Sequence, residues 1–181
     1  MLLLLAGITA CSVNVKKDDN GQEKKVDIDT PFGGIHVDKN ADVRDTGLPV
    51  YAGARIKQKG ENGEEKSANV NISAGGYGLK VVAVEFESDD PPSKLIAYYK
   101  DQLKKYGNVL ECHTSKHGAN YTVHDSKSDS KALKCDSDDG TNIELKVGTE
   151  DNQHIVSIEP QGKGADFALV YVRTRGKEGS I

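Results

Sequence analysis

The sequence predicts an α+β fold: a mostly antiparallel sheet with one amphipathic helix packed on one face, preceded by N-terminal β-hairpins. Three observations predict it. Short segments of alternating apolar and polar residues flank Gly-rich breaks in the first half of the chain. Residues 91–106 carry apolar side chains at helical spacings of three or four. A run of consecutive strand-like segments follows that helix, which favours antiparallel pairing.

The composition excludes several classes of protein. The 181 residues include 24 Lys and Arg against 28 Asp and Glu, a net charge of −4, and this weak acidity argues against a nucleic-acid-binding protein. A hydrophobic share of 36% and a mean hydropathy of −0.57 indicate a soluble body. Three cysteines are too few for a disulfide-dense scaffold or a multi-cysteine metal cluster. We expect one domain at 26–175 and a C-terminal tail at 176–181.

The one strongly apolar stretch is residues 1–10, which end directly before Cys11. Ten residues are too few to cross a bilayer, which takes about 20. They resemble the signal peptide of bacterial lipoproteins, in which a small residue precedes an obligatory Cys, and Ile8-Thr9-Ala10-Cys11 matches that lipobox. The resemblance implies cleavage before Cys11, a diacylglycerol on its thiol and a palmitate-like acyl chain on the new amine. The leader is short and lacks a basic residue, which a start codon assigned too far downstream would explain.

Residues 11–25 are expected to form a lipidated Cys and a flexible tether. The run from Lys16 to Lys25 has no apolar side chain and cannot bury surface. In the lipoprotein family, Ser12 in place of Asp is consistent with sorting to the outer membrane of a two-membrane bacterium. We therefore expect a cell-envelope protein on the periplasmic side of that membrane.

Two segments of the first half are predicted as β-hairpins. Residues 26–37 alternate around a Gly-containing turn, and residues 70–81 repeat that pattern over twelve positions. A duplicated unit and a chance likeness of two Gly-turn hairpins both explain the repeat. Between the hairpins, we expect a loop at 45–54 and a solvated hairpin tip at 57–66, where the charges cancel.

The clearest single element is a helix at 91–106. Asp89 or Asp90 can cap it, Pro91 fits its first position, where no N–H bond is needed, and Gly107 can adopt the left-handed closing conformation. Its apolar stripe consists of Leu95, Ile96, Tyr99, Leu103 and Tyr106.

Two segments, 79–86 and 167–172, are apolar on both faces and are predicted as central strands. Further strands are expected at 109–114, 132–136, 142–147 and 154–158. Asp139-Gly140 is expected to form a tight turn between the second and third of these. This order of strand, Pro-started helix and meander loosely resembles small bacterial envelope lipoproteins of unassigned function.

Cys112 and Cys135 remain once Cys11 is assigned to lipid. Cys112 shares strand parity with Leu110, and Cys135 with Leu133, so both face the same apolar side if their strands pair antiparallel. In an oxidising compartment such a pair forms a disulfide. It would close a loop of about 24 residues and stabilise the fold by about 3.4 kcal/mol. Two buried free thiols, or a reactive or metal-binding role, are the alternatives.

Three histidines lie in or beside the loop between these cysteines, His113, His117 and His124, with Asp125 and Asp129 nearby. A spacing of four keeps the first two on one face of a helix or strand, but the Glu of zinc peptidases is missing between them. The loop is therefore either a weak transition-metal site or a set of exposed histidines.

Other candidate residues have simpler explanations. His154 shares parity with apolar strand neighbours and is expected to be half-buried, and His36 is a hairpin residue. An EF-hand ending on Gly140 would need Cys135 as its first ligand, so a turn explains residues 136–140 better than a calcium site. The nucleophile elbow, the phosphate loop, the dinucleotide fingerprint and the C-x-x-C motif are absent from the sequence.

The sequence favours a lipid-anchored envelope protein whose domain is non-catalytic. That domain has a structural role or binds a protein or cell-wall partner, and the membrane is reached through the lipid anchor; no cofactor or metal site is assigned. The alternative is a periplasmic small-ligand or metal-binding protein that uses the His113–Asp129 loop. A hydrolase with an unrecognised site is a third hypothesis.

Overall fold

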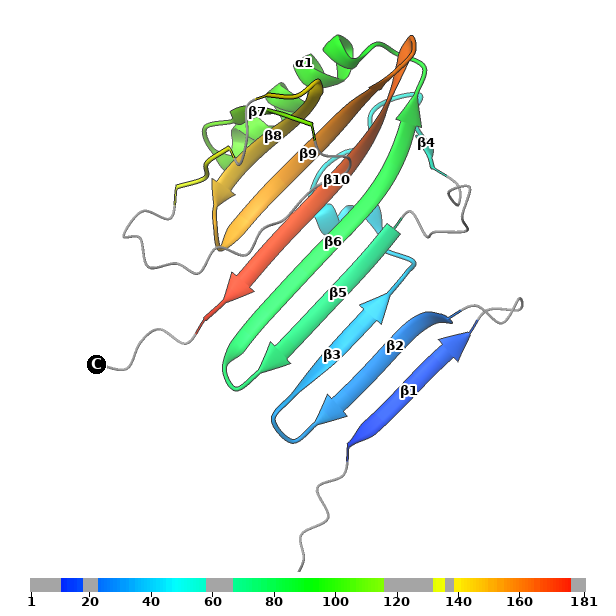
Figure 1. Cartoon of the computed structure of the whole chain (residues 1–181), viewed down its shortest axis with the longest axis vertical. Coiled ribbons are helices and arrows are strands. Elements are labelled where there is room, and N and C mark those ends of the chain that lie inside the picture. Colours follow the sequence, from blue (N-terminus) through cyan, green and yellow to red (C-terminus); the bar gives the residue numbers. More distant parts are fainter. Residues whose placement is uncertain (1–10, 18–22, 58–66, 116–131, 136–138, 177–181) are drawn as a thin grey trace, which may run out of the picture.

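The computed structural model describes residues 11–17, 23–57, 67–115, 132–135 and 139–176. These residues form one ten-stranded antiparallel sheet and one α-helix (Figure 1). The strand order is β1-β2-β3-β5-β6-β10-β9-β8-β7, and β4 pairs with β6 next to the start of β5. The predicted mostly antiparallel sheet with one helix is therefore confirmed.

The strands are β1 (Ser12–Lys17), β2 (Glu23–Thr30), β3 (Gly33–Asp38), β4 (Arg55–Ile56), β5 (Ser67–Ala74), β6 (Tyr77–Ser88), β7 (Leu110–Thr114), β8 (Asn142–Thr149), β9 (Asn152–Gln161) and β10 (Gly164–Arg175). The expected loop after β3 contains a short 3₁₀ helix, η1 (Val43–Thr46), before a stretch without regular structure.

Both predicted hairpins are present, as β2 with β3 and β5 with β6. They lie side by side because β3 also pairs with β5. Gly33 is needed where the two hairpins meet. Its φ is +152°, and a Cβ there would lie 1.9 Å from the carbonyl oxygen of Ser73, so a larger residue would separate the strands.

The two segments predicted as central strands, 79–86 and 167–172, lie in β6 and β10 and are central in the sheet. β6 pairs with β5 on one edge and β10 on the other, while β10 pairs with β6 and β9. Phe86 of β6 is in register with Phe167 of β10, and their rings stack with centroids 5.3 Å apart. Because β6 belongs to the first half of the chain and β10 to its end, this pair unites the two halves.

The helix α1 comprises Pro92–Leu103, and a 3₁₀ turn, η2 (Lys104–Tyr106), extends it. The expected capping by Asp89 or Asp90 is wrong, because Pro91 occupies the N-cap position without a side-chain hydrogen bond. A residue before proline is held in the extended region, and Pro92 follows. Pro92 therefore takes the first helical position. Gly107 also differs from expectation, since its φ of 136° and ψ of −157° lie outside the left-handed helical region.

The two aspartates bind other groups instead. Asp89 accepts two hydrogen bonds of 2.9 Å from the guanidinium of Arg55, which lowers the pKa of Asp89. Asp90 accepts hydrogen bonds from Lys94 at 2.7 Å and from the Tyr51 hydroxyl at 2.8 Å, and these bonds lower the pKa of Asp90. Both carboxylates thus attach the chain before β5 to the start of α1.

The main core lies between α1 and one face of the sheet. Leu95, Tyr99 and Leu103, spaced by four along the helix, are fully buried. They form one cluster with apolar side chains of β6, β8, β9 and β10, namely Val84, Phe86, Ile143, Leu145, Val147, Val156, Ile158, Ala165, Phe167 and Leu169. Figure 1 shows α1 behind the β7, β8 and β9 side of the sheet, away from β1.

Tyr99 also ties the loop after η1 to this core. Its hydroxyl accepts a hydrogen bond from the backbone N–H of Tyr51 at 3.1 Å and donates one to the carbonyl oxygen of Pro49 at 3.3 Å. Burial raises the pKa of Tyr99, so the hydroxyl stays protonated and can donate.

Replacing Tyr99 with Phe tests this tie. We expect Tyr99→Phe to lower the free energy of unfolding by about 1–2 kcal/mol, because a buried N–H and a carbonyl lose their partner. Chemical denaturation measures this. Tyr98→Phe is the matched control, since Tyr98 makes ring contacts with Tyr51 and Tyr99 that a Phe keeps. Equal losses in the two variants would contradict the assignment.

Candidate functional site

Cys11 is an exposed free cysteine. It is the first described residue of the chain and directly precedes β1. Ser12, the first residue of β1, is in register with Asp29 near the end of β2. Cys11 therefore lies beside the turn between β2 and β3, at the edge of the sheet. The leader, residues 1–10, lies outside the described residues.

The described part of residues 11–25 differs from the expected flexible tether. Residues 12–17 form β1, and β2 begins at Glu23. The prediction from polar composition was wrong because strands pair through their backbone groups. An edge strand needs apolar side chains on one face only, which means at every second position. The alternation of Val13 and Val15 was the signal for this strand.

The first five strands of the sheet place apolar side chains on one face in two rows that run across the strands. The row nearer to Cys11 consists of Val13, Ile28, Ile35, Ile72 and Leu79. The row behind it consists of Val15, Val26, Val37, Val70 and Val81. Cross-strand rows of β-branched side chains stabilise a sheet, and they make this face uniformly aliphatic.

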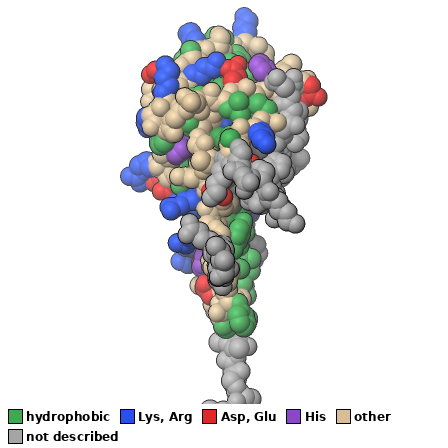
Figure 2. All heavy atoms as spheres, turned by 90° about the vertical axis from the view of Figure 1, so that its left-hand side faces the viewer, with side chains coloured by type: hydrophobic (Ala, Val, Ile, Leu, Met, Phe, Trp, Pro, Cys, Tyr) green, Lys and Arg blue, Asp and Glu red, His purple; other side chains and the backbone are tan. Residues whose placement is uncertain are grey.

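This apolar face is partly open to solvent. Val13 is 66% exposed and Ile35 is 40% exposed. This face is turned away from α1, because Leu79 and Val81 pack in a second cluster with Val170 and Val172 rather than with the helix. Figure 2 shows the part of the sheet formed by β1, β2 and β3 edge-on. Hydrophobic side chains lie along one side of it and charged side chains along the other. Contiguous exposed apolar areas are candidate interaction surfaces in proteins.

The opposite face of the same strands is polar, as the alternation requires. Asp27 and His36 are in register there, and Nδ1 of His36 lies 2.9 Å from the Asp27 carboxylate. Asn71 follows on β5 and donates a hydrogen bond of 2.9 Å to Asn69. His36 is thus a hairpin residue, as expected.

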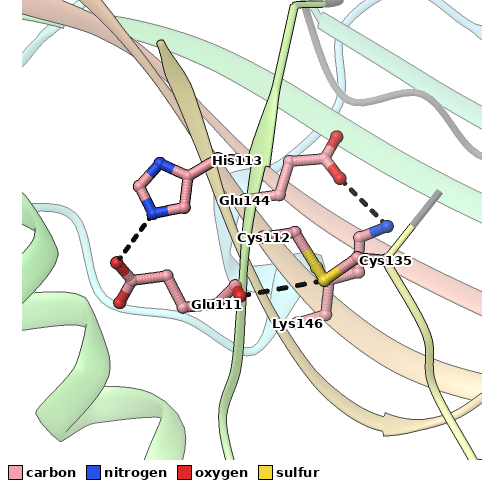
Figure 3. The surroundings of a disulfide bond; sticks show 6 residues. All are labelled: Glu111, Cys112, His113, Cys135, Glu144 and Lys146. Atoms are coloured by element: carbon pink, nitrogen blue, oxygen red, sulfur yellow. Dashed lines mark hydrogen bonds and ion pairs between the residues drawn. A yellow bond between two sulfur atoms is a disulfide. The ribbon is translucent and has the colours of Figure 1, made fainter. Parts of the chain in front are cut away.

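Cys112 and Cys135 lie at disulfide distance, with their Cα atoms 5.5 Å apart (Figure 3). Cys112 belongs to β7 and is 1% exposed. The expected strand at 132–136 is wrong for the described residues 132–135, which have no regular structure, so no hairpin joins them to β8. β8 already has β7 and β9 as its two neighbours, so residues 132–135 cannot join it through a tight turn.

The surroundings of the disulfide are polar rather than apolar. Cys112 is in register with Glu144, whose carboxylate lies 2.9 Å from the ammonium of Lys146. Both side chains are at least nine-tenths buried, so the two charges compensate each other where water is scarce. The Cys135 sulfur lies 3.7 Å from the Glu111 carbonyl oxygen, a plain contact because a disulfide sulfur has no proton to donate.

Gly140, expected in a hairpin turn, has a different role. A Cβ on Gly140 would lie 1.7 Å from the backbone carbon of Thr114, so the chain before β8 passes directly against the end of β7. Only glycine permits this approach. Residues 136–138 lie outside the described residues.

The predicted metal loop is described only at its start. His113 lies on β7 with about half of its side chain exposed, and its Nε2 is 3.5 Å from the Glu111 carboxylate. His117, His124, Asp125 and Asp129 lie outside the described residues. Within the described ranges, no group of three or more His, Cys, Asp and Glu side chains could hold a metal ion.

His154 is half-buried on β9, as its parity predicts. Its Nδ1 lies 2.9 Å from the carbonyl oxygen of Thr46, and its ring stacks on Tyr106 with centroids 3.8 Å apart. Burial lowers the pKa of His154 more than the hydrogen bond to Thr46 raises it. The neutral ring therefore holds η1 against the sheet.

Among the described residues, no helix has both the length and the apolar character needed to cross a bilayer. Comparisons with protein-family models, with curated proteins and with solved structures found no match for this chain. The functional argument therefore depends on the residues themselves.

Removing the disulfide tests its contribution. The cysteines are 23 residues apart, and the double variant Cys112→Ala/Cys135→Ala is expected to lose about 3 kcal/mol of unfolding free energy. Chemical denaturation measures the loss of stability, and the intact mass of the oxidised domain should rise by the mass of two hydrogen atoms on reduction. Cys11→Ser is the control and should leave both readings unchanged. An unchanged mass on reduction would show free thiols.

The pH dependence of stability tests His154. Its pKa is lowered in the folded state from an ordinary value of 6.5, so below pH 6.5 the unfolded chain binds more protons. The His154 contribution is therefore complete above pH 6.5 and is lost as the pH falls toward the folded-state pKa. The stability difference between wild type and His154→Gln should be constant at higher pH and shrink on acidification. A difference that stays constant on acidification would contradict this.

Proposed function

We propose that this chain is a lipid-anchored bacterial envelope protein with a non-catalytic domain that binds a partner or has a structural role. The observation that carries the proposal is the exposed Cys11, which follows the Ile8-Thr9-Ala10 lipobox and directly precedes the edge strand β1. By analogy with lipoproteins, acyl chains on Cys11 anchor the domain at the periplasmic side of the outer membrane.

The anchor chemistry is sufficient for stable attachment. Each buried CH₂ of an acyl chain contributes about 0.8 kcal/mol, so two or more chains hold a soluble domain at a membrane where one would not. Ser12 already pairs with Asp29, so the sheet begins one residue after the lipid-bearing Cys. The domain would therefore stay close to the membrane surface.

The apolar face of β1, β2, β3 and β5 favours a binding role. Its two rows are aliphatic and carry no charge, as in the faces through which sheets pack on other proteins. A cell-wall glycan would instead require hydrogen-bonding groups and aromatic rings, which these rows lack. Of the two partner types expected, a protein therefore fits this face better.

Metabolic labelling tests the anchor. A clickable palmitate analogue should label the wild-type protein in its native envelope, and Cys11→Ser should lose the label because the acceptor thiol is gone. The label should resist neutral hydroxylamine, since the glycerol oxygen esters and the amide survive it and a thioester does not.

The double variant Cys112→Ala/Cys135→Ala is the matched control and should be labelled like the wild type. Equal labelling of wild type and Cys11→Ser would refute the lipid anchor.

A further inference from the structure

Two turns of the sheet come together at the end where Cys11 lies. The turn between β2 and β3 holds Phe32, and the turn between β5 and β6 holds Gly75. The backbone N–H of Gly75 donates a hydrogen bond of 3.0 Å to the carbonyl oxygen of Phe32, so the turns form one surface. We call residues 30–34 and 74–78 the tip. Figure 1 shows both turns at the end of the sheet where β1 starts.

The tip is apolar and exposed. Phe32 is 79% exposed, the highest value among the large hydrophobic side chains of the described residues, and Tyr77 is 41% exposed. The tip contains no charged residue. Aromatic side chains with an apolar body are the residues that proteins place at the interface between membrane and water.

The backbone of the Phe32 turn is already satisfied within the protein. The N–H of Phe32 donates to the Thr30 hydroxyl oxygen at 3.3 Å, and that hydroxyl donates to the carbonyl oxygen of Gly33 at 2.7 Å. The carbonyl oxygen of Phe32 accepts from Gly75. Unpaired backbone groups make a turn costly to remove from water, and both backbone groups of Phe32 are paired.

The other end of the same strands has the opposite character. Lys16 and Lys17 end β1, and Lys24 and Lys25 lie at the start of β2. Charge is therefore distributed unevenly along the strands, and the charged end favours contact with water. At the end that carries Cys11, the tip itself has no charged side chain.

Two charged residues flank the tip. Asp29 is in register with Ser12, and its carboxylate lies 3.5 Å from Nε2 of His36. Arg175, near the end of β10, is in register with Gly78. These two flanking residues are one acidic and one basic.

We propose that the tip inserts Phe32 and Tyr77 into the headgroup region of the membrane that holds the acylated Cys11. This inference rests on the lipid anchor proposed above. The anchor places the tip at the lipid surface, the aromatic side chains contact it, and the sheet stands with its charged end away from the membrane. The partner of this surface is a phospholipid bilayer.

The chain contains no Trp, so a single introduced Trp reports on its own surroundings. Acylated Phe32→Trp protein, purified from the envelope, is reconstituted into vesicles of phosphatidylethanolamine and phosphatidylglycerol. We expect the emission to shift to shorter wavelength and to be quenched most strongly by lipids brominated near the headgroup end of the acyl chain.

Ile56→Trp is the matched control. Ile56 is 58% exposed and pairs with Phe86 at the far end of β6, roughly 30 Å from Tyr77 at the strand rise of about 3.3 Å per residue. Trp at position 56 should keep a solvent-exposed emission and escape the quencher. Quenching at both positions would overturn the upright arrangement.

Failure of the tip contact and failure of the anchor give different results. If Cys11 takes the palmitate label but Trp at position 32 is not quenched, the tip contact is wrong and the anchor stands. If Cys11 takes no label, both proposals are overturned.

A second measurement uses exchange between vesicles. Acylated Phe32→Ser/Tyr77→Ser should transfer from donor to acceptor vesicles about tenfold faster than wild type, because a buried aromatic side chain no longer holds it. An unchanged transfer rate with an unchanged far-UV spectrum would overturn the proposal.

Discussion

The pairing of β6 with β10 is the interaction on which the rest of the structure depends. It runs from Ala165 opposite Ser88 to Arg175 opposite Gly78, and it joins the N-terminal hairpins to the C-terminal meander in one sheet. On one face, Phe86 and Phe167 meet beneath Tyr99 of the helix. Because a two-stranded hairpin is marginal in water, the N-terminal strands gain their stability from this attachment to a packed core.

The sheet changes character across this pair. Toward β9 and β8 one face is covered by α1 and the other holds a second buried cluster with Ile155 and Val170. On this second face the apolar rows continue through Leu79 and Val81 toward β1 and reach solvent at Val13 and Ile35. Stability is therefore concentrated at one end and exposed apolar surface at the other, where Cys11 also lies. This division is compatible with the proposed lipid anchor and binding role, since it keeps the proposed contact surface apart from the core.

The errors of the sequence-based predictions have physical causes. Composition predicted a tether at 11–25, but an edge strand satisfies its backbone through β2 and needs only Val13 and Val15 on one face. The alternation of side chains predicted a strand around Cys135, but both edges of β8 are already paired with β7 and β9. The expected disulfide is therefore present and the expected strand is not. The helix cap was misplaced because two consecutive prolines shift the first helical position to Pro92.

The sequence by itself determined the local elements: the two Gly-turn hairpins, the central strands, the helical stripe with Tyr99 and the lipobox before Cys11. Each depends on residues close together in the chain, through side-chain alternation, turn geometry or helical spacing. Only the tertiary structure decided that β3 lies beside β5 and β6 beside β10, because these pairings join distant segments and many strand orders satisfy the same local pattern. That strand order aligns the apolar rows and places Phe32 and Tyr77 at the same end as Cys11.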